Sequence, residues 1–330
     1  NTTLAGEGKY GGELITAFSA DPGGFDPAMG PSGMSHVVIE QVYGTLINLD
    51  ANAEPYPGLA ESWTQSEDGL KWTFKLRPNL TFHNGEALTA EDVVFTFNRL
   101  LPEDSGYSYR SQIETIDSIV ADDELTVTFN MNTVTGPFEI YMAFPGSSIV
   151  PKDLVESGHD LNAEPVGSGP FKFVSYSPRD SIKFVKNDNY YEPGRPYLDA
   201  LTYRIVSDPT ALSNGLKSGE IHFSNEVPPK DWKTIISKNN MTDASLEGSR
   251  YYWMIPNHER GALGNPLVRK AISTVLNREA IVKAAFFGQA TPMLGGVIPE
   301  WNWGYAGISM SDPGGNIEKA KELMAQAGVE

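Results

Sequence analysis

Residues 71–77, KWTFKLR, alternate strictly between apolar and polar side chains, and this alternation constrains the fold more than any other feature. Such a run places its apolar residues on one face of a half-buried β-strand. The pair Asp68 and Gly69 just before it favours a tight turn, which predicts a hairpin back to residues 61–65. Similar alternation in residues 125–130 and 201–206 predicts two further strands.

Helical patterns lie between and after these strands. Residues 89–101 carry an apolar stripe behind Thr89, a preferred N-cap residue. After about residue 255 three more helices are expected, at 266–275, 278–287 and 316–328. The apolar stripes of the first and last of these must be buried, and we expect them to pack on each other. Mixed strands and helices indicate an α/β or α+β fold, and 330 residues suggest two or more domains.

Composition excludes several classes of protein. The net charge of −17 and the isoelectric point near 4.7 argue against nucleic-acid binding, because little could neutralise a run of phosphates. The absence of cysteine excludes disulfides, thiolate zinc sites and cysteine nucleophiles. No stretch approaches the ~18 consecutive apolar residues of a membrane helix. The first residues are polar and glycine-rich, so we expect a soluble protein whose signal peptide has been removed.

The glycine-flanked serine in residues 164–173, EPVGSGPFKF, matches neither a phosphate-binding loop nor a nucleophile loop. A phosphate loop carries GxxxxGK[ST] at the start of a helix, whereas Pro170 and a strand pattern follow here. A nucleophile elbow requires GxSxG at a strand-to-helix turn, which is also missing. We interpret the segment as a turn through which the chain enters a strand.

No other pattern indicates catalysis. His36 and Glu40 stand four residues apart on a predicted helix, but one such pair is weak support for a metal site and an ordinary helix face explains it. The five histidines are scattered along the chain. We therefore predict no catalytic residues, no metal site and no cofactor. A hydrolase or a metal-dependent lyase is the alternative class.

A series of longer segments, in order along the chain, carries a resemblance to a known family. The segments are GGELITAFSADPGGFDPA, LAESW, FHNGEALTAEDVVF, VGSGPFKF, NDNYYEPGRPYLDALTYRIV, LKSGEIHF and NPLVRKAISTVLNREAIVKAAFFGQATP. They closely resemble the large bacterial extracellular solute-binding proteins of the dipeptide, oligopeptide and nickel-binding family, which serve ABC importers. The resemblance extends over essentially the whole chain.

The resemblance implies an α/β fold of the periplasmic-binding-protein type II-like kind, cluster C. A mixed-sheet lobe one would comprise residues 1–50 and 166–255, with an extra α+β domain at 51–165. Residues 256–330 would be the start of lobe two. The segment 164–173 would then be the crossing from the extra domain back to lobe one. Family members are considerably longer, so the sequence resembles their N-terminal portion, with a truncated lobe two.

The function implied by the resemblance is capture of a small solute between two lobes and its delivery to an ABC permease in the membrane. Closure about a hinge would bury the solute. Peptides are the expected solutes, and opines, oligosaccharides and nickel chelates are the alternatives. We expect a periplasmic monomer of a Gram-negative bacterium that binds no nucleic acid. A solute sensor on the same scaffold, without transport, is a further alternative.

The resemblance also places candidate ligand-binding residues in five short segments. For each segment a structural role is the competing interpretation: a glycine turn for the first, a solvated loop for the second, and packing for the aromatic ones. The candidates are Ser32, Gly33 and Met34; Tyr109 and Arg110; Asn225 and Glu226; Tyr252 and Trp253; and Trp301 and Trp303.

Overall fold

The computed structural model describes residues 8–29, 33–50, 52–238, 241–244, 251–296, 298, 300, 304–307 and 312–329. Its contacts divide the chain into two units, residues 1–226 and 227–330, each of which is considered by itself. Among the described residues no helix is long and apolar enough to cross a membrane. The four-part division expected from the sequence stays a prediction.

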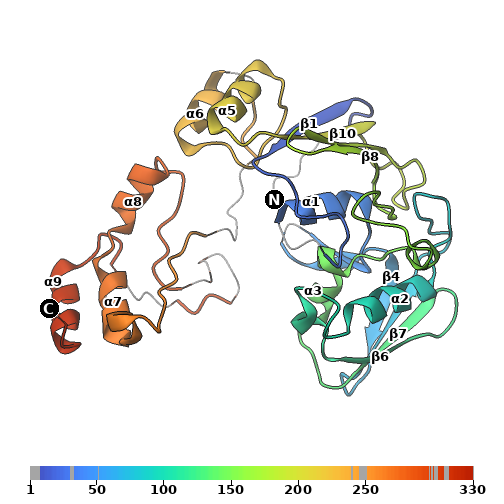
Figure 1. The fold of residues 1–330 in the computed structure, drawn as a ribbon, viewed down its shortest axis with the longest axis horizontal. Coiled ribbons are helices and arrows are strands. Elements are labelled where there is room, and N and C mark those ends of the chain that lie inside the picture. The colour runs from blue at the N-terminus through green and yellow to red at the C-terminus, as the bar shows by residue number, and fades with distance from the viewer. Residues whose placement is uncertain are drawn as a thin grey trace. The chain divides into compact units, whose positions relative to one another are not determined.

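The first sheet of unit 1 joins the start of the chain to a segment almost two hundred residues later. Its strand order is β1-β10-β9-β8, with β1 parallel to β10 and the other pairs antiparallel. The strands are β1 (Glu13–Phe18), β8 (Phe171–Ser177), β9 (Ser181–Lys186) and β10 (Ala200–Ile205). Helix α1 (Gly33–Val42) packs on this sheet, where Val38 and Ile39 join a core with Phe184 and Tyr203 (Figure 1).

The second sheet is antiparallel, with the order β4-β5-β7-β6. Its strands are β4 (Ala60–Gln65), β5 (Lys71–Leu76), β6 (Ile116–Ala121) and β7 (Thr126–Met131). The pairing of β4 with β5 confirms the predicted hairpin. Helix α2 (Ala90–Leu100) contacts β6 and β7, and its start confirms Thr89 as the N-cap residue.

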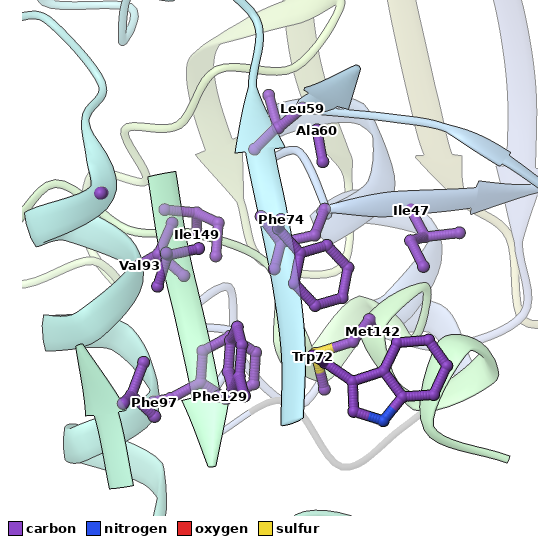
Figure 2. Close-up of a cluster of buried hydrophobic side chains, with 14 of the residues drawn as sticks. Ile47, Leu59, Ala60, Trp72, Phe74, Val93, Phe97, Phe129, Met142 and Ile149 are labelled. Carbon is purple, nitrogen blue, oxygen red and sulfur yellow. The ribbon is translucent and has the colours of Figure 1, made fainter. Parts of the chain in front are cut away.

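Alternation along β5 explains why this sheet has a large core. Phe74 is fully buried and contacts Phe129 edge to face at 5.5 Å between ring centroids. Phe97 of α2 meets Phe129 from the other side at 5.0 Å. Figure 2 shows these rings converging between the helix and the strands. The stripe predicted for residues 89–101 is therefore the face that covers the sheet.

Shorter elements connect these parts of unit 1. The strands β2 (Ile47–Leu49) and β3 (Pro55–Pro57) pair with each other. The remaining helices of unit 1 are α3 (Phe138–Met142), α4 (Lys152–Glu156) and α5 (Pro209–Ser218), with 3-10 turns at Arg110–Gln112 and Pro145–Ser147.

The segment 164–173 leads from the part of the chain that carries the second sheet into β8, where the sequence pattern predicted a strand. A Cβ atom on Gly169 would lie 2.6 Å from the carbonyl oxygen of Gln41, and one on Gly167 would collide with that of Val42. Only glycine permits this approach to the end of α1. The Gly169 N–H donates to the Val42 carbonyl at 2.8 Å, and the His83 N–H donates to the Gly167 carbonyl at 2.7 Å.

The secondary-structure elements that the structure describes in unit 2 are all helices. Its helices are α6 (Pro229–Lys238), α7 (Pro266–Val275), α8 (Arg278–Ala285) and α9 (Ile317–Gln326), with a 3-10 turn at Gly261–Gly264. Ala271 of α7 packs with Ala320 and Leu323 of α9, which confirms that the two helices pack on each other, whereas Val275 and Ile317 of the predicted stripes stay exposed. Asn265 caps α7 by accepting from the Leu267 N–H at 2.9 Å.

The buried imidazole of His83 predicts a pH-dependent stability. Burial lowers the pKa of His83 to about 4, below its value near 6.5 in an unfolded chain. The folded state therefore binds fewer protons in this window, so His83 destabilises the fold progressively as the pH falls from about 6.5 to 4. We expect unfolding by urea to show up to about 3 kcal/mol of stability lost over this range that His83→Gln does not lose.

His258→Gln provides the matched control, because it makes the same substitution at an exposed position. Identical profiles for the wild-type protein and His83→Gln would show that the buried imidazole does not set this dependence.

Candidate functional site

The first turn of α1 lies against an aromatic wall supplied by the part of the chain that carries the second sheet. Gly33 and Met34 begin the helix, and His36 follows within one turn. The His36 ring meets Phe144 edge to face at 5.0 Å and lies 5.7 Å from the Tyr109 ring. Tyr109 and Phe144 contact each other at 4.5 Å. The structure thus brings three predicted residues, Gly33, Met34 and Tyr109, into one region.

Sequence reasoning considered His36 only as a weak metal partner of Glu40, and missed its place in this wall. The available signal was its helical spacing from Gly33, because residues three apart share one face of a helix. Without knowledge of the fold, nothing indicated that Phe144 would meet that face. The contact joins segments more than a hundred residues apart.

Arg110 is held back onto its own part of the chain. Its Nε donates to the Leu101 carbonyl at 2.7 Å, and Nη1 lies 3.6 Å from a carboxylate oxygen of Glu114. About a third of the side chain is exposed. These contacts fix its orientation without using all of its donors. Its role as a ligand contact stays a prediction.

The loop before α1 is fixed by a buried ion pair. Asp26 is almost fully buried and binds Arg99 of α2 through both carboxylate oxygens, with Nη1 to Oδ1 at 2.9 Å. The Phe25 and Asp26 N–H groups donate to Oδ1 of Asn162 at 3.0 and 3.1 Å. Because a buried carboxylate is costly unless paired, Arg99 determines where this loop can lie. The candidate turn at the start of α1 therefore follows a rigid support.

Asn225 and Glu226 end a segment that runs beside β1. The His222 N–H donates to the Ile15 carbonyl at 2.8 Å, and the Ile15 N–H donates to Nδ1 of His222 at 3.1 Å. A carboxylate oxygen of Glu226 accepts from the Ser19 N–H at 3.0 Å. Glu226 therefore fixes the turn that leaves β1.

An apolar cavity of about 200 Å³ lies next to Asn225. Phe223 and Val37 contribute to its walls, together with residues of β1 and β10. Asn225 supplies one of its few polar groups, so the cavity suits an apolar occupant better than a charged one.

The aromatic candidates of unit 2 that the structure describes are largely exposed. Tyr252 is 78% and Trp253 is 67% exposed, so neither is buried in a core of the described residues. Trp253 contacts Tyr251 at 5.5 Å, whereas Tyr252 contacts Phe286 at 4.9 Å. Three further predicted residues lie outside the described residues: Ser32, Trp301 and Trp303.

Three of the four described histidines of unit 1 hydrogen-bond the backbone, whereas His36 packs in the aromatic wall. His83 hydrogen-bonds the Gly169 carbonyl at 3.0 Å, His159 the Glu164 carbonyl at 2.7 Å, and His222 the Ile15 N–H. In the described part of the chain, no three histidine or acidic side chains are placed to hold a metal ion. What this arrangement offers a solute is aromatic surface and oriented polar groups.

Comparison with known proteins agrees with this arrangement. The family described as bacterial extracellular solute-binding proteins, family 5 Middle, matches residues 54–330. The oligopeptide-binding protein AppA of Bacillus subtilis is 32% identical over 98% of this chain and 61% of its own length. The glutathione-binding protein GsiB of Pectobacterium atrosepticum is 29% identical over 92% of this chain and 59% of its own. The chain thus spans about three-fifths of the length of these relatives.

Solved structures confirm the predicted α/β fold. The periplasmic binding protein DppA of Helicobacter pylori, in complex with the peptide STSA, superposes with a TM-score of 0.87 at 30% identity. That match covers 97% of this chain and 67% of the other. AgaA of Agrobacterium tumefaciens, in complex with agropinic acid, gives a TM-score of 0.81 at 31% identity, over 96% of this chain and 64% of its own.

The buried ion pair of Asp26 and Arg99 predicts a large effect on stability. Arg99→Met leaves the Asp26 carboxylate buried without its partner, and we expect this to lower the free energy of unfolding by about 3 kcal/mol. Arg195→Met is the matched control, because the Arg195–Glu192 pair is exposed and its loss should cost less than about 1 kcal/mol. Urea unfolding measures both, and equal effects of the two substitutions would contradict the role given to Asp26.

Proposed function

The chain belongs to the bacterial extracellular solute-binding proteins of family 5, and we propose that it forms part of the substrate-binding component of an ABC importer. The observation that carries the proposal is the match of 97% of the chain to a protein solved with a bound peptide. The component would capture peptides or related small solutes outside the cell membrane and deliver them to a permease. It would release its solute chemically unchanged.

The proposed binding surface of unit 1 is the aromatic wall with the first turn of α1. Tyr109 offers a ring whose one side is already held by Phe144, so little side-chain entropy is lost when a solute contacts the other side. Arg110 is oriented nearby by the Leu101 carbonyl and would bind a carboxylate. Asn225 and Glu226 would add polar contacts beside β1.

Tyr252 and Trp253 are proposed as contacts from unit 2, since they belong to a run of exposed apolar side chains, and contiguous apolar patches mark binding surfaces. Ser32, Trp301 and Trp303 are the remaining proposed contacts.

Peptides are favoured over opines and metal chelates because aromatic surface combined with single oriented polar groups accepts varied side chains. A periplasmic location and a monomeric state belong to the same proposal. A sensor without transport would use the same surface, and an adjacent permease would distinguish transport from sensing.

Calorimetry with defined tetrapeptides tests the proposal. A form extended to the length of the relatives should bind at least one peptide at micromolar concentration or below, and the 330-residue chain should bind it at least 100-fold more weakly. Tyr109→Leu should weaken binding by the extended form about 10-fold, because it removes the aromatic contact.

Tyr197→Leu is the control, since Tyr197 is an exposed ring elsewhere in unit 1. Mass analysis should recover the peptide intact. Conversion of more than one equivalent of peptide per protein would overturn the proposal in favour of an enzyme. Equally tight binding by the 330-residue chain and the extended form would show that the proposed surface needs no contribution from the extension.

A further inference from the structure

A second concave surface in unit 1 shares no residue with the candidate site. It is an open groove of about 610 Å³, within the range of roughly 300–1,000 Å³ typical of small-molecule sites. Three segments line it: Glu61 on β4, residues 77–81 after β5, and residues 189–191 after β9. The groove thus lies where the second sheet meets a loop of the first.

The central cation of the groove is held before any ligand arrives. Arg77 donates from Nε to the Gly58 carbonyl at 2.7 Å and from Nη2 to the Pro57 carbonyl at 3.5 Å. Its guanidinium lies 5.1 Å from the ring centroid of Tyr191. The Tyr191 hydroxyl in turn accepts from Nδ2 of Asn48 at 3.2 Å. Because Arg77 is already ordered, binding there loses little side-chain entropy.

The charge of the groove favours an anion. Glu61 is neutralised by Lys75, whose Nζ lies 3.0 Å from its Oε1. Arg77, by contrast, bonds two neutral carbonyl groups, and none of the described carboxylates pairs with it. This leaves a local positive charge on a chain whose net charge is −17. A guanidinium with a fixed fork of donors is the group best suited to a carboxylate.

The other residues that line the groove supply hydrogen-bonding groups. Asn79 and Asn189 offer exposed amides, and Thr81 and Tyr190 offer hydroxyls. Burial raises the pKa of Tyr190 well above its usual value, and its hydroxyl hydrogen-bonds Tyr191. The Tyr190 ring packs on Tyr191 at 4.6 Å and adds an apolar face. One cation, several neutral polar groups and one apolar face match a molecule with a single carboxylate, several hydroxyls and an apolar ring face.

From this arrangement we propose that the groove is a binding site for a hydroxylated monocarboxylate of the size of a sugar acid, with Arg77 holding the carboxylate. Asn79, Asn189 and Thr81 hold the hydroxyl groups, and the ring of Tyr190 contacts the apolar face. A phosphate is disfavoured, because only one unpaired cation of the described residues lines the groove. The site is independent of the solute-binding surface proposed above.

Titration of the 330-residue chain with D-galacturonate, followed by calorimetry and by NMR of the asparagine side-chain amides, tests this proposal. We expect a dissociation constant below about 1 mM and shifts of the Asn79 and Asn189 amides. D-galactose, which lacks the carboxylate, should bind at least 10-fold more weakly, and inorganic phosphate should not compete. Absence of shifts at millimolar galacturonate, or equal binding of galactose, overturns the proposal.

Matched variants locate the site. Arg77→Lys removes the fork of donors and should weaken galacturonate binding at least 10-fold, whereas Arg195→Lys, at the exposed stack on Tyr197, should change it less than twofold. Asn79→Gly removes an amide and retains the positive φ of 60° without strain, so it remains informative if Arg77→Lys unfolds. We expect about a threefold loss. Unchanged binding by both variants places the ligand elsewhere and overturns the proposal.

Tyr109→Leu separates this site from the solute-binding surface. It should leave galacturonate binding unchanged, and its loss of galacturonate binding would contradict the proposal without bearing on peptide capture.

Discussion

The backbone contact between the end of α1 and the crossing at residues 167–169 is the constraint on which the rest of unit 1 depends. At this point the chain returns from the second sheet and enters β8 of the first. Two glycines let the backbone approach α1 within hydrogen-bonding distance, and His83, in the loop between β5 and α2, hydrogen-bonds the same segment. Any side chain at Gly167 would push α1 away from this segment. It would also disturb the contact between His36 of α1 and Phe144 of the aromatic wall.

Local features of the fold could be predicted from the sequence, because local physics determines them. The hairpin of β4 and β5 follows from alternation and a turn, and the cap at Asn265 follows from its place before Pro266. The parallel pairing of β1 with β10 could not be predicted in this way, because it joins strands separated by almost two hundred residues. The alternation marks which face of each strand is buried, but it does not identify which distant strand lies beside it.

In the candidate site, too, the sequence indicated local segments but not the contacts between distant ones. The resemblance marked Gly33 and Tyr109 as candidate ligand-binding residues. The wall that joins them depends on His36 and Phe144, which no motif marks. The Asp26–Arg99 pair was likewise invisible in the sequence, although Asp26 lies in a segment that carries the resemblance. A buried pair is a relation between two side chains, and neither partner alone differs from a surface residue. The sequence therefore indicated only a candidate region, and the fold shows which residues support it.

Unit 2 contains a run of large apolar side chains that are exposed. Four consecutive residues, 252–255, are each more than 60% exposed, although all are large and apolar. Leaving such a run in water forfeits about 1.5–3 kcal/mol for each side chain that could be buried. A bound solute or a further part of a longer chain would recover this energy, and the relatives are longer than the present chain. The wall at α1 differs, since its rings already bury one another. The rings at α1 are therefore preformed, whereas the run at 252–255 gains most of its stabilisation when something covers it.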